Sequence, residues 1–256
     1  MATPLLVKLY RAYFKFASVD SFLTRRFIAR AANMSPSVGV GICLDIGAGN
    51  APFRKELSRR FGVRHYLALD FTSSDSVRVI ADAPALPIRD QSVDLVVCFE
   101  VVQHIARYQA VLDEMTRVLR PGGRVIVTFP FMYAECDVVD FRRWTVAGMA
   151  QELEDRGFTV LAAARRGGAA FVVTNLAIWA IQHIVPGARA TWRSRRTVAA
   201  YSREGLLAVL TFPLVLLGWL AVAGDGLFSP SGCYTGGLIF ASLPRGVPTQ
   251  LVDCND

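Results

Sequence analysis

From residue 41 onward, short apolar and often β-branched runs alternate with stretches whose apolar residues recur every three or four positions. The short runs predict strands and the longer stretches predict helices. Seven strands are expected, at Ile42–Ile46, Tyr66–Leu69, Val77–Ile80, Val93–Phe99, Val125–Phe129, Phe158–Ala164 and Gly237–Leu243. Because several of these strands are continuously apolar and are separated by helices, the pattern predicts a doubly wound α/β fold with a sheet covered on both faces.

Helices are expected between these strands and before the first one. The three that follow the first, fourth and fifth strands cover Pro52–Phe61, Tyr108–Leu119 and Thr145–Gly157. Pro121-Gly122-Gly123 should close the second of these, because proline cannot continue a helix and glycine accommodates its end. The stretch from Leu5 to Phe16 separates apolar from basic side chains on a helical wheel, so it predicts an amphipathic basic helix. Another helix is expected near Ser21–Ala32.

Composition narrows the class of protein. With 256 residues, 53% hydrophobic and 19% charged, the chain is neither disordered nor of low complexity. Its net charge of +7 is uneven, because residues 1–34 and residues 186–203 each carry a net charge of +5 beside apolar segments. That distribution suits a lipid surface better than a nucleic acid. The five cysteines are scattered and odd in number, so they predict no disulfide framework, no zinc site and a cytoplasmic location.

The most informative motif is the loop that follows the first predicted strand, Leu44-Asp45-Ile46-Gly47-Ala48-Gly49-Asn50. Its glycines allow a tight turn and a close approach of the backbone to a ligand. The third glycine of a dinucleotide-binding loop is missing, and Asp45 would repel a pyrophosphate. Asp45, Gly47 and Gly49 therefore favour a ligand that carries an ammonium group.

Two further acids follow neighbouring strands. Asp70 ends the second predicted strand, where a carboxylate can accept hydrogen bonds from both hydroxyls of a ribose. Asp82, with Ala83 beside it, follows the third strand and is placed to accept a hydrogen bond from an exocyclic amine. A cationic amino-acid end, a ribose and an adenine together describe S-adenosylmethionine. Taken singly, each acid is better explained as a helix cap or turn residue.

About half of the chain, from Cys43 to about Gly168, resembles the class I S-adenosylmethionine-dependent methyltransferases, most closely the type 11 methyltransferase-domain group. The segments that carry the likeness are LDIGAGN, YLALD, ADAPALPIRDQSVDLVVCFEVVQHI and VLDEMTRVLRPGGRVIVTFP. The resemblance implies a Rossmann-like, seven-stranded, mostly parallel sheet whose last strand is antiparallel. It also implies that Asp45, Gly47 and Gly49 hold the methionine part of the cofactor, that Asp70 holds the ribose, and that Asp82 and Ala83 hold the adenine.

Glu100 and His104 follow the fourth predicted strand, next to the expected position of the reactive methyl group. Glu100 is predicted to belong to the cofactor site. With an unperturbed pKa of about 6.5, His104 could remove a hydroxyl proton, so it is the candidate catalytic base. Alternatively, His104 only shapes the pocket, because methyl transfer to an amine or a stabilised carbanion needs no strong base.

The segment Asp140-Phe141-Arg142-Arg143-Trp144-Thr145 resembles a D-[FY]-x-R-[FY]-T element of methyltransferases encoded with polysaccharide and glycolipid genes. The resemblance implies that Asp140 and Arg143 form an ion pair on the acceptor side, that Trp144 lies beside them, and that Thr145 caps the next helix. Trp144 departs from the usual Phe or Tyr. A purely structural ion pair is the alternative interpretation.

Two apolar runs, Gly167–Ala188 and Gly205–Gly224, lie between the sixth and seventh strands and contain no charged residue. Each is about as long as the ~20 residues that a bilayer-crossing helix needs. A crossing hairpin would separate the basic residues 186–203 from a cofactor that is also cytoplasmic, so we predict that the pair does not span. We expect an apolar helical insertion that caps the acceptor cleft, dimerises or dips into one leaflet. Two ordinary core helices are the alternative.

The predicted organisation has three parts. Residues 1–38 form N-terminal amphipathic helices, residues 39–166 with 236–246 form the cofactor-binding domain, and residues 167–235 form the insertion. The leading functional hypothesis is O-methylation of a bulky, glycan or lipid-linked acceptor by a cytoplasmic enzyme, peripheral at the inner face of the membrane and capable of dimerising. The alternatives are C-methylation of a quinone-like acceptor and a non-catalytic cofactor-binding partner subunit. RNA methylation ranks low, and no metal site is predicted.

Overall fold

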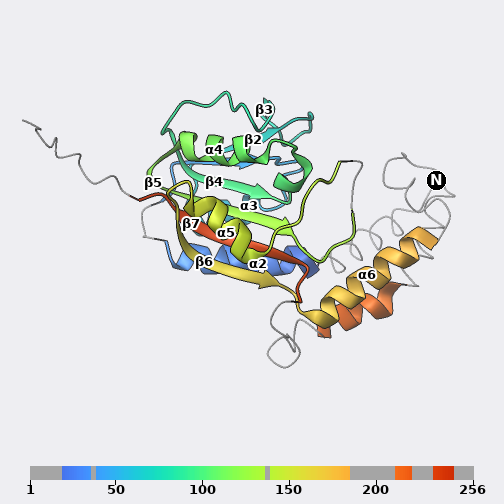
Figure 1. Ribbon diagram of the computed structural model, residues 1–256. Coiled ribbons are helices and arrows are strands. Elements are labelled where there is room, and N and C mark those ends of the chain that lie inside the picture. The colour runs from blue at the N-terminus through green and yellow to red at the C-terminus, as the bar shows by residue number, and fades with distance from the viewer. Residues whose placement is uncertain (1–18, 36–38, 136–138, 185–210, 221–232, 245–256) are drawn as a thin grey trace, which may run out of the picture. The chain divides into compact units, whose positions relative to one another are not determined.

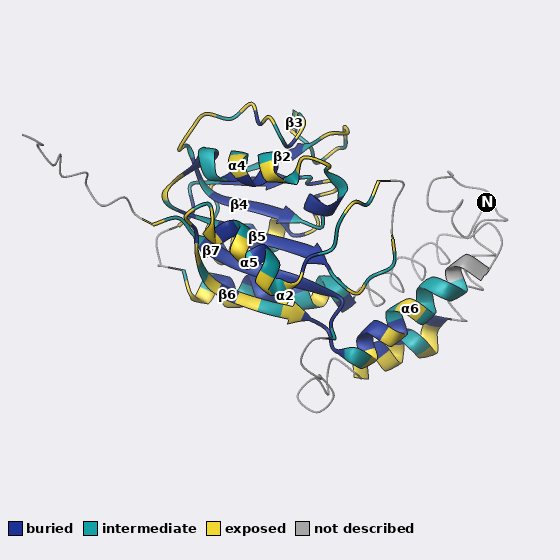
Figure 2. Cartoon of the chain, in the orientation of Figure 1, coloured by how far each residue is buried: buried dark blue, intermediate teal, exposed yellow. Residues whose placement is uncertain are grey.

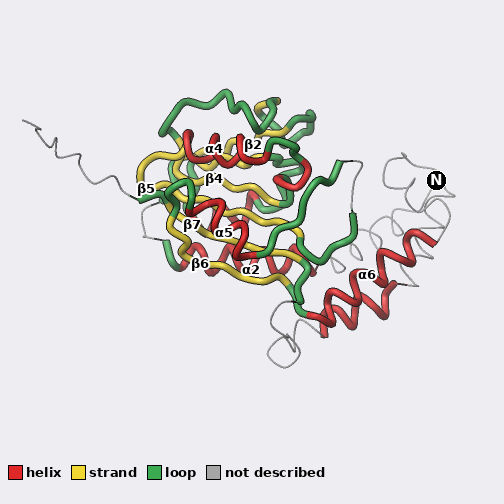
Figure 3. Tube along the Cα trace, viewed as in Figure 1, coloured by secondary structure: helices red, strands yellow, loops and turns green. Residues whose placement is uncertain are grey.

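A computed structural model describes residues 19–35, 39–135, 139–184, 211–220 and 233–244 of the chain. Its seven strands form one sheet in the order β3-β2-β1-β4-β5-β7-β6 (Figure 1). The strands are β1 (Ile42–Ile46), β2 (His65–Asp70), β3 (Val79–Ile80), β4 (Val93–Phe99), β5 (Leu119–Pro130), β6 (Thr159–Arg166) and β7 (Gly236–Ser242). The helices are α2 (Val19–Asn33), α3 (Arg54–Phe61), the short 3₁₀ helix η1 (Val102–His104), α4 (Tyr108–Val118), α5 (Val146–Glu154) and α6 (Ala169–Ile184), and residues 211–220 are also helical (Figure 3).

The chain divides into two compact units. The sheet unit is drawn from Phe27–Phe129, Val138–Ala164 and Gly237–Asp256. The helical unit is drawn from Met1–Arg26, Pro130–Asp137 and Arg165–Gly236. Helix α2 contributes residues to both units, as do the strands β5, β6 and β7 at one end each.

Strand β1 lies inside the sheet, with β2 on one side and β4 on the other, and both pairings are parallel. Strand β7 runs the other way. The Leu243 amide donates to the Gly123 carbonyl at 2.9 Å, and the Phe131 amide donates to the Thr235 carbonyl at 2.8 Å, so residue numbers rise in one strand as they fall in the other. The predicted sheet with an antiparallel last strand is confirmed.

Apolar side chains fill both faces of the sheet, which explains why the central strands read as continuous apolar runs. One core cluster joins Leu44 and Ile46 of β1 to residues of α4 and α5. The other joins Cys43 of β1 to residues of α2 and α3. Figure 2 shows the central strands in the buried colour. Because side chains alternate along a strand, β1 sends odd-numbered residues to one core and even-numbered residues to the other.

The connection between α4 and β5 differs from the prediction. Helix α4 ends at Val118, and the strand begins at once with Leu119, so Pro121-Gly122-Gly123 lies inside β5 instead of closing the helix. The pairing of β4 with β5 shifts here, from Val93 opposite Leu119 to Leu95 opposite Arg124. The extra residues form a bulge, a place where a sheet tolerates proline and glycine. Sequence reasoning assigned these residues to a helix end because a bulge uses the same residue types.

The remaining element bounds lie close to those predicted. The largest other difference is at α5, which ends at Glu154 instead of Gly157, and β3 begins at Val79 instead of Val77. Thr145 caps α5 as expected, since its side chain accepts a hydrogen bond from the Gly148 amide at 3.0 Å. Within the ranges that the structure describes, no helix is long and apolar enough to cross a bilayer. The predicted helix from Leu5 to Phe16 and the arginines of residues 186–203 lie outside the described residues.

Gly237 of β7 is a position in the sheet unit where packing demands glycine. A Cβ atom at Gly237 of β7 would lie 2.3 Å from Cζ of Phe129 and 3.0 Å from Val146. Phe129 is fully buried, so its ring has little room to retreat. We therefore expect Gly237→Ala to lower the free energy of unfolding by about 1–3 kcal/mol, measured by chemical denaturation. In a Phe129→Leu background, Gly237→Ala should lower the free energy of unfolding by less than it does in the wild type. Equal losses in the two backgrounds would contradict this account.

Candidate cofactor and acceptor site

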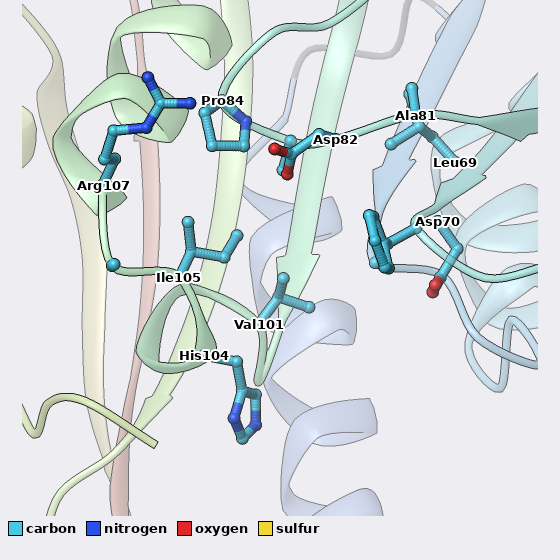
Figure 4. A pocket seen from close by; sticks show the side chains of 13 residues that line it. Leu69, Asp70, Ala81, Asp82, Pro84, Val101, His104, Ile105 and Arg107 are labelled. Atoms are coloured by element: carbon cyan, nitrogen blue, oxygen red, sulfur yellow. The ribbon is translucent and has the colours of Figure 1, made fainter. Parts of the chain in front are cut away.

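A pocket of about 470 Å³ opens at the carboxyl ends of β1, β2, β3 and β4 (Figure 4). Open α/β sheets bind ligands at this edge. Its lining residues are Gly47, Leu69, Asp70, Phe71, Ala81, Asp82, Ala83, Pro84, Val101, His104, Ile105, Ala106 and Arg107. The volume lies within the range of roughly 300–1,000 Å³ typical of small-molecule sites.

The structure brings together only some of the residues that the sequence singled out. Those that line the pocket are Gly47, Asp70, Asp82, Ala83 and His104. Those that do not are Asp45, Gly49, Glu100, Asp140, Arg143 and Trp144. The first group comes from four separate segments of the chain, which the parallel strands bring to one edge.

The loop after β1 has an unusual backbone. Gly47 and Gly49 have φ values of +68° and +50°, and Ala51 has a φ of +48°. A Cβ atom at Gly47 would lie 2.3 Å from a methyl group of Val101, so this glycine lets the loop after β1 touch the segment after β4. Left-handed backbone is costly for alanine. Ala51 therefore stores strain in the loop that Gly47 begins, a feature that its residue type did not signal.

Asp70 ties the loop to the end of β2. Its Oδ2 accepts a hydrogen bond from the Gly49 amide at 2.8 Å. Its Oδ1 accepts from the Thr72 amide at 2.9 Å and from the Thr72 hydroxyl at 3.0 Å. Asp70 thus stabilises the turn after β2, as aspartate often does in turns, and it also lines the pocket. A carboxylate has about four acceptor positions, so three bonds leave capacity for a ligand.

Asp45 is buried within β1, with only 2% of its surface exposed. It lies on the face of the sheet that α2 and α3 cover, and its carboxylate accepts a hydrogen bond from the Tyr66 hydroxyl. Burial raises the pKa of Asp45 from 3.8 to about 7, against the effect of the Tyr66 bond, and the nearby charge of Asp70 adds to the rise. Asp45 therefore lies behind the loop and couples electrostatically to the pocket.

Two residues of α4 hold the segment that carries Asp82 and Ala83. Glu114 accepts a hydrogen bond from the Leu86 amide at 2.6 Å, and Arg117 donates to the carbonyls of Leu86 and Ile88 at 3.0 and 2.8 Å. The hydrogen bond from Arg117 holds the pKa of Glu114 below its ordinary value. No described residue donates a hydrogen bond to the Asp82 carboxylate. The backbone of this segment is thus fixed while the acid itself is exposed.

Hydrogen bonds orient the ring of His104. Its Nδ1 lies 2.6 Å from the Val139 carbonyl oxygen, which can only accept, so Nδ1 carries a proton. In the neutral ring Nε2 therefore holds the lone pair. The amide nitrogen of Gln103 lies 3.2 Å from Nε2 and is placed to donate to it. In this tautomer Nε2 carries no proton, so it could accept one as a general base. It lies, however, within hydrogen-bond distance of the Gln103 amide nitrogen.

Residues 139–144 fasten one wall of the pocket from outside. The Phe141 amide donates to the Gln103 carbonyl at 2.8 Å. The guanidinium of Arg142 donates to the carbonyls of Ile105 and Ala106 at 3.3 and 3.0 Å. It also lies 4.7 Å from the centre of the Tyr108 ring. Sequence reasoning missed Arg142, although its place in the motif was visible, because nothing in the sequence says which carbonyls an arginine reaches.

The predicted ion pair of Asp140 with Arg143 is present. It is bidentate, with Nη2 of Arg143 at 2.7 Å from Oδ2 of Asp140, and the Asp140 side chain is fully buried. The structure does not place Trp144 beside a cleft: it is 8% exposed and packs edge-on against Tyr108 and near Phe129 in the core. The large ring serves core packing because the chain turns inward just before α5.

Glu100 is not among the residues that line the pocket, but it directly precedes Val101, which is. It follows β4 with a φ of +56°, and its amide donates to the carbonyl and hydroxyl oxygens of Thr128 at 3.2 and 3.1 Å. A non-glycine residue in this region costs on the order of 1–3 kcal/mol and is concentrated at functional sites. The strain makes the chain turn sharply before Val101 and His104, which do line the pocket.

Phe71 and Arg107 are pocket residues that the sequence did not reveal. Phe71 directly follows Asp70, and 74% of its surface is exposed, which is unusual for so large an apolar side chain. Figure 4 shows Arg107 next to Pro84, on the segment that leads into α4. The signal that could have identified Phe71 is its position: a residue just after a strand-ending acid lies at the ligand-binding edge.

Among the described residues, no group of three or more His, Cys, Asp or Glu side chains could hold a metal ion. Cys43 and Cys98 are buried and free, and Cys233 is free and partly exposed. Burial raises the pKa of both buried thiols. These two cysteines therefore act as small core residues.

Comparison with known proteins adds an independent line of evidence. Residues 44–127 match the family model described as a methyltransferase domain. A malonyl-acyl-carrier-protein O-methyltransferase from Methylococcus capsulatus is 32% identical over 143 residues, which cover 45% of this chain and 51% of that protein. A ubiquinone/menaquinone biosynthesis C-methyltransferase from Roseobacter denitrificans is 31% identical over 110 residues, covering 37% of this chain and 44% of that protein. The chain thus spans about half the length of these relatives.

A solved structure agrees on the fold. A protein from Galdieria sulphuraria, assigned as a sarcosine dimethylglycine methyltransferase, superposes with a TM-score of 0.56 and covers 89% of this chain and 88% of its own. The two sequences are only 15% identical. At that distance the likeness is one of fold alone.

The raised pKa of Asp45 leads to a prediction about stability. The folded state holds the Asp45 proton up to about pH 7, whereas the unfolded chain releases it near pH 3.8. Stability should therefore fall as pH rises through this window and level off above it. Because one pKa unit corresponds to about 1.4 kcal/mol, the change is on the order of 4 kcal/mol. Urea denaturation from pH 4 to 8 measures it.

Asp45→Asn should flatten that pH dependence, since the amide has no proton to lose and its oxygen still accepts from Tyr66. Asp75, an exposed acid outside the pocket, supplies the control variant Asp75→Asn. If the Asp45→Asn protein keeps the full slope of the wild type, burial does not perturb this carboxyl as described.

Proposed function

We propose that this protein is an S-adenosylmethionine-dependent methyltransferase that methylates an oxygen atom of a bulky, glycan- or lipid-linked acceptor; the match of residues 44–127 to a methyltransferase-domain model supports the first part. The observation that carries the proposal is the Asp70 carboxylate, which lines the pocket and accepts the Gly49 amide of the motif loop. It joins the two segments that a nucleoside with an amino-acid tail would touch.

The residues present fit S-adenosylmethionine by size and by chemistry. The pocket of about 470 Å³ suits a ligand of nucleoside size or larger. Asp70 and Asp82 supply acceptors for hydroxyl and amine hydrogens, as the ribose and adenine require. Phe71 offers an exposed aromatic face against which a base can stack. Negative charge at Asp70 favours the cationic end, and Asp45 adds to it only in its ionised form, because burial raises the pKa of Asp45 to about 7.

When bound, S-adenosylmethionine supplies an electrophilic methyl group on a positively charged sulfur. The protein's own contribution is alignment and exclusion of water. Val101 and Ile105 give the pocket an apolar wall on the side of His104. Arg142 keeps that wall in place through its bonds to the main chain. An acceptor hydroxyl would then lose its proton to Nε2 of His104, after this atom releases the Gln103 amide.

C-methylation of a quinone-like acceptor remains the second candidate. The relative from Roseobacter denitrificans is named for that chemistry, and the apolar insertion would suit such an acceptor. The third candidate is not an enzyme but a cofactor-binding subunit without catalytic activity. The intact acids Asp70 and Asp82 in one pocket favour binding under all three alternatives. Methyl transfer to a product distinguishes the enzymes from the subunit, and the methylated atom distinguishes the enzymes from each other.

The cofactor proposal predicts the effect of one acid. Asp70→Asn should weaken S-adenosylmethionine binding by about tenfold or more, because hydrogen bonds to a charged group contribute roughly 1.5–3 kcal/mol. Isothermal titration calorimetry measures the change. Asp75→Asn, five residues along and exposed, should bind like the wild type. No binding by the wild-type protein, or equal binding by both variants, would sink the assignment.

The base proposal predicts a change in turnover. His104→Gln should lower kcat for an oxygen acceptor by about 10²–10⁴ while the Kd for S-adenosylmethionine changes far less. Transfer of a radiolabelled methyl group to lipid and glycan extracts provides the assay. His65→Gln serves as the control, since His65 is exposed at the start of β2 and outside the pocket. An unchanged kcat for His104→Gln would leave the ring a purely structural role.

A further inference from the structure

Two helices of the helical unit are uncharged and pack against each other. Neither α6 nor the helix over residues 211–220 contains a Lys, Arg, Asp or Glu. A Cβ atom at Gly218 would touch Phe171 and Thr174 at 3.4 Å, so the two helices meet at this glycine. Figure 1 shows them side by side. Phe171 and Val215 are buried, at 4% and 3% exposure, so one side of each helix is already used for packing.

Other apolar side chains on these helices are exposed. We call Val173, Leu176, Phe212, Leu216, Leu217 and Leu220 the apolar face; they are 44–65% exposed. Phe212, Leu216 and Leu220 recur every four residues and so lie along one side of their helix. Figure 2 shows exposed positions on both helices. Exposed apolar side chains along one side of a helix are typical of a surface that another molecule covers.

Aromatic and basic groups in the same unit adjoin these helices. The ring of Trp219 lies 4.9 Å from that of Phe22, and the guanidinium of Arg26 lies 5.9 Å from the Phe22 ring centre. Phe22 is itself 38% exposed. Tryptophan and arginine beside an apolar surface are typical of the boundary between lipid tails and head groups, where one end of each side chain is apolar and the other polar.

The positive charge of the chain indicates whether a membrane surface or a second copy of the chain covers the apolar face. The sequence between the two helices carries five arginines and no acid within residues 186–203, and residues 1–34 add a net charge of +5. In a dimer, two copies that each carry a net charge of +7 would repel each other. Anionic lipid head groups would instead attract them. Charge complementarity therefore favours a membrane surface over a second copy.

We propose that the apolar face docks this protein onto an anionic phospholipid bilayer, with its side chains at the boundary of head groups and acyl chains. The helices then lie in the interface plane, with their buried sides packed against each other and their exposed apolar side chains in the lipid. The proposal goes beyond the proposed function and does not depend on cofactor binding. It would nevertheless bring the pocket to a lipid-linked acceptor.

Vesicle flotation of the full-length protein tests the proposal. We expect it to float with phosphatidylcholine vesicles that contain phosphatidylglycerol, more weakly with phosphatidylcholine alone, and less at high salt. The triple variant Phe212→Gln, Leu216→Gln, Leu220→Gln should reduce flotation by about tenfold or more, because three apolar side chains no longer enter the lipid. Val173→Gln with Leu176→Gln is an independent variant on α6.

The matched control replaces exposed apolar residues of the sheet unit. Ile80→Gln with Leu161→Gln changes side chains that are 65% and 37% exposed, and it should float like the wild type. Failure of the wild-type protein to float with anionic vesicles would overturn the proposal. So would flotation that the triple variant and the control lose equally.

Two further measurements separate the alternatives. Sedimentation equilibrium of the wild type without lipid should show a monomer, and a dimer that the triple variant abolishes would assign the apolar face to a second copy and overturn the lipid proposal. Calorimetric titration with S-adenosylmethionine should give the same Kd for the triple variant and the wild type. If the wild-type protein does not bind S-adenosylmethionine, the proposed function is contradicted, but the flotation result still supports the lipid proposal.

Discussion

The parallel alignment of β1 with both of its neighbours is the constraint on which the site depends. Hydrogen bonding of β1 to β2 and β4 in the same direction forces three chain reversals to one edge of the sheet. At that edge there is no room for a side chain between the loop after β1 and the segment after β4, where Gly47 meets Val101. The contact holds only if residue 47 is glycine, because its φ is also positive. The pocket is the space left between these reversals.

Hydrogen bonds made by side chains then hold in place the loops that the strands bring to this edge. Asp70 fastens the first loop, Glu114 and Arg117 fasten the segment with Asp82, and Arg142 fastens the wall near His104. Each of these residues bonds to backbone groups of a distant segment. A site held in this way is arranged before a ligand arrives, so less binding free energy is lost in ordering it. Asp45 lies behind the loop, where burial raises its pKa to about 7 and so weakens the negative charge that it contributes.

The helices of the helical unit depart from the usual amphipathic pattern. Its two uncharged helices bury the side on which Gly218 meets Phe171 and expose leucines, a valine and a phenylalanine elsewhere. A helix that keeps only one side buried normally carries charges on the other. The departure from that rule is what makes the apolar face a candidate binding surface. The two proposals therefore concern different units: the pocket belongs to the sheet unit and the apolar face belongs to the helical unit.

The sequence by itself predicted the α/β fold class and identified the motif loop, because the spacing of apolar residues and the placement of glycines are local properties. The antiparallel direction of the last strand was implied by the family resemblance. The sequence also identified Gly47, Asp70, Asp82, Ala83 and His104 as residues that would converge. Only the tertiary structure decided that Asp45 lies behind the loop, that Trp144 belongs to the core, and that Pro121 sits in a bulge. Those outcomes depend on which distant backbone or ring lies next to each side chain, and residue spacing along one chain carries no such information.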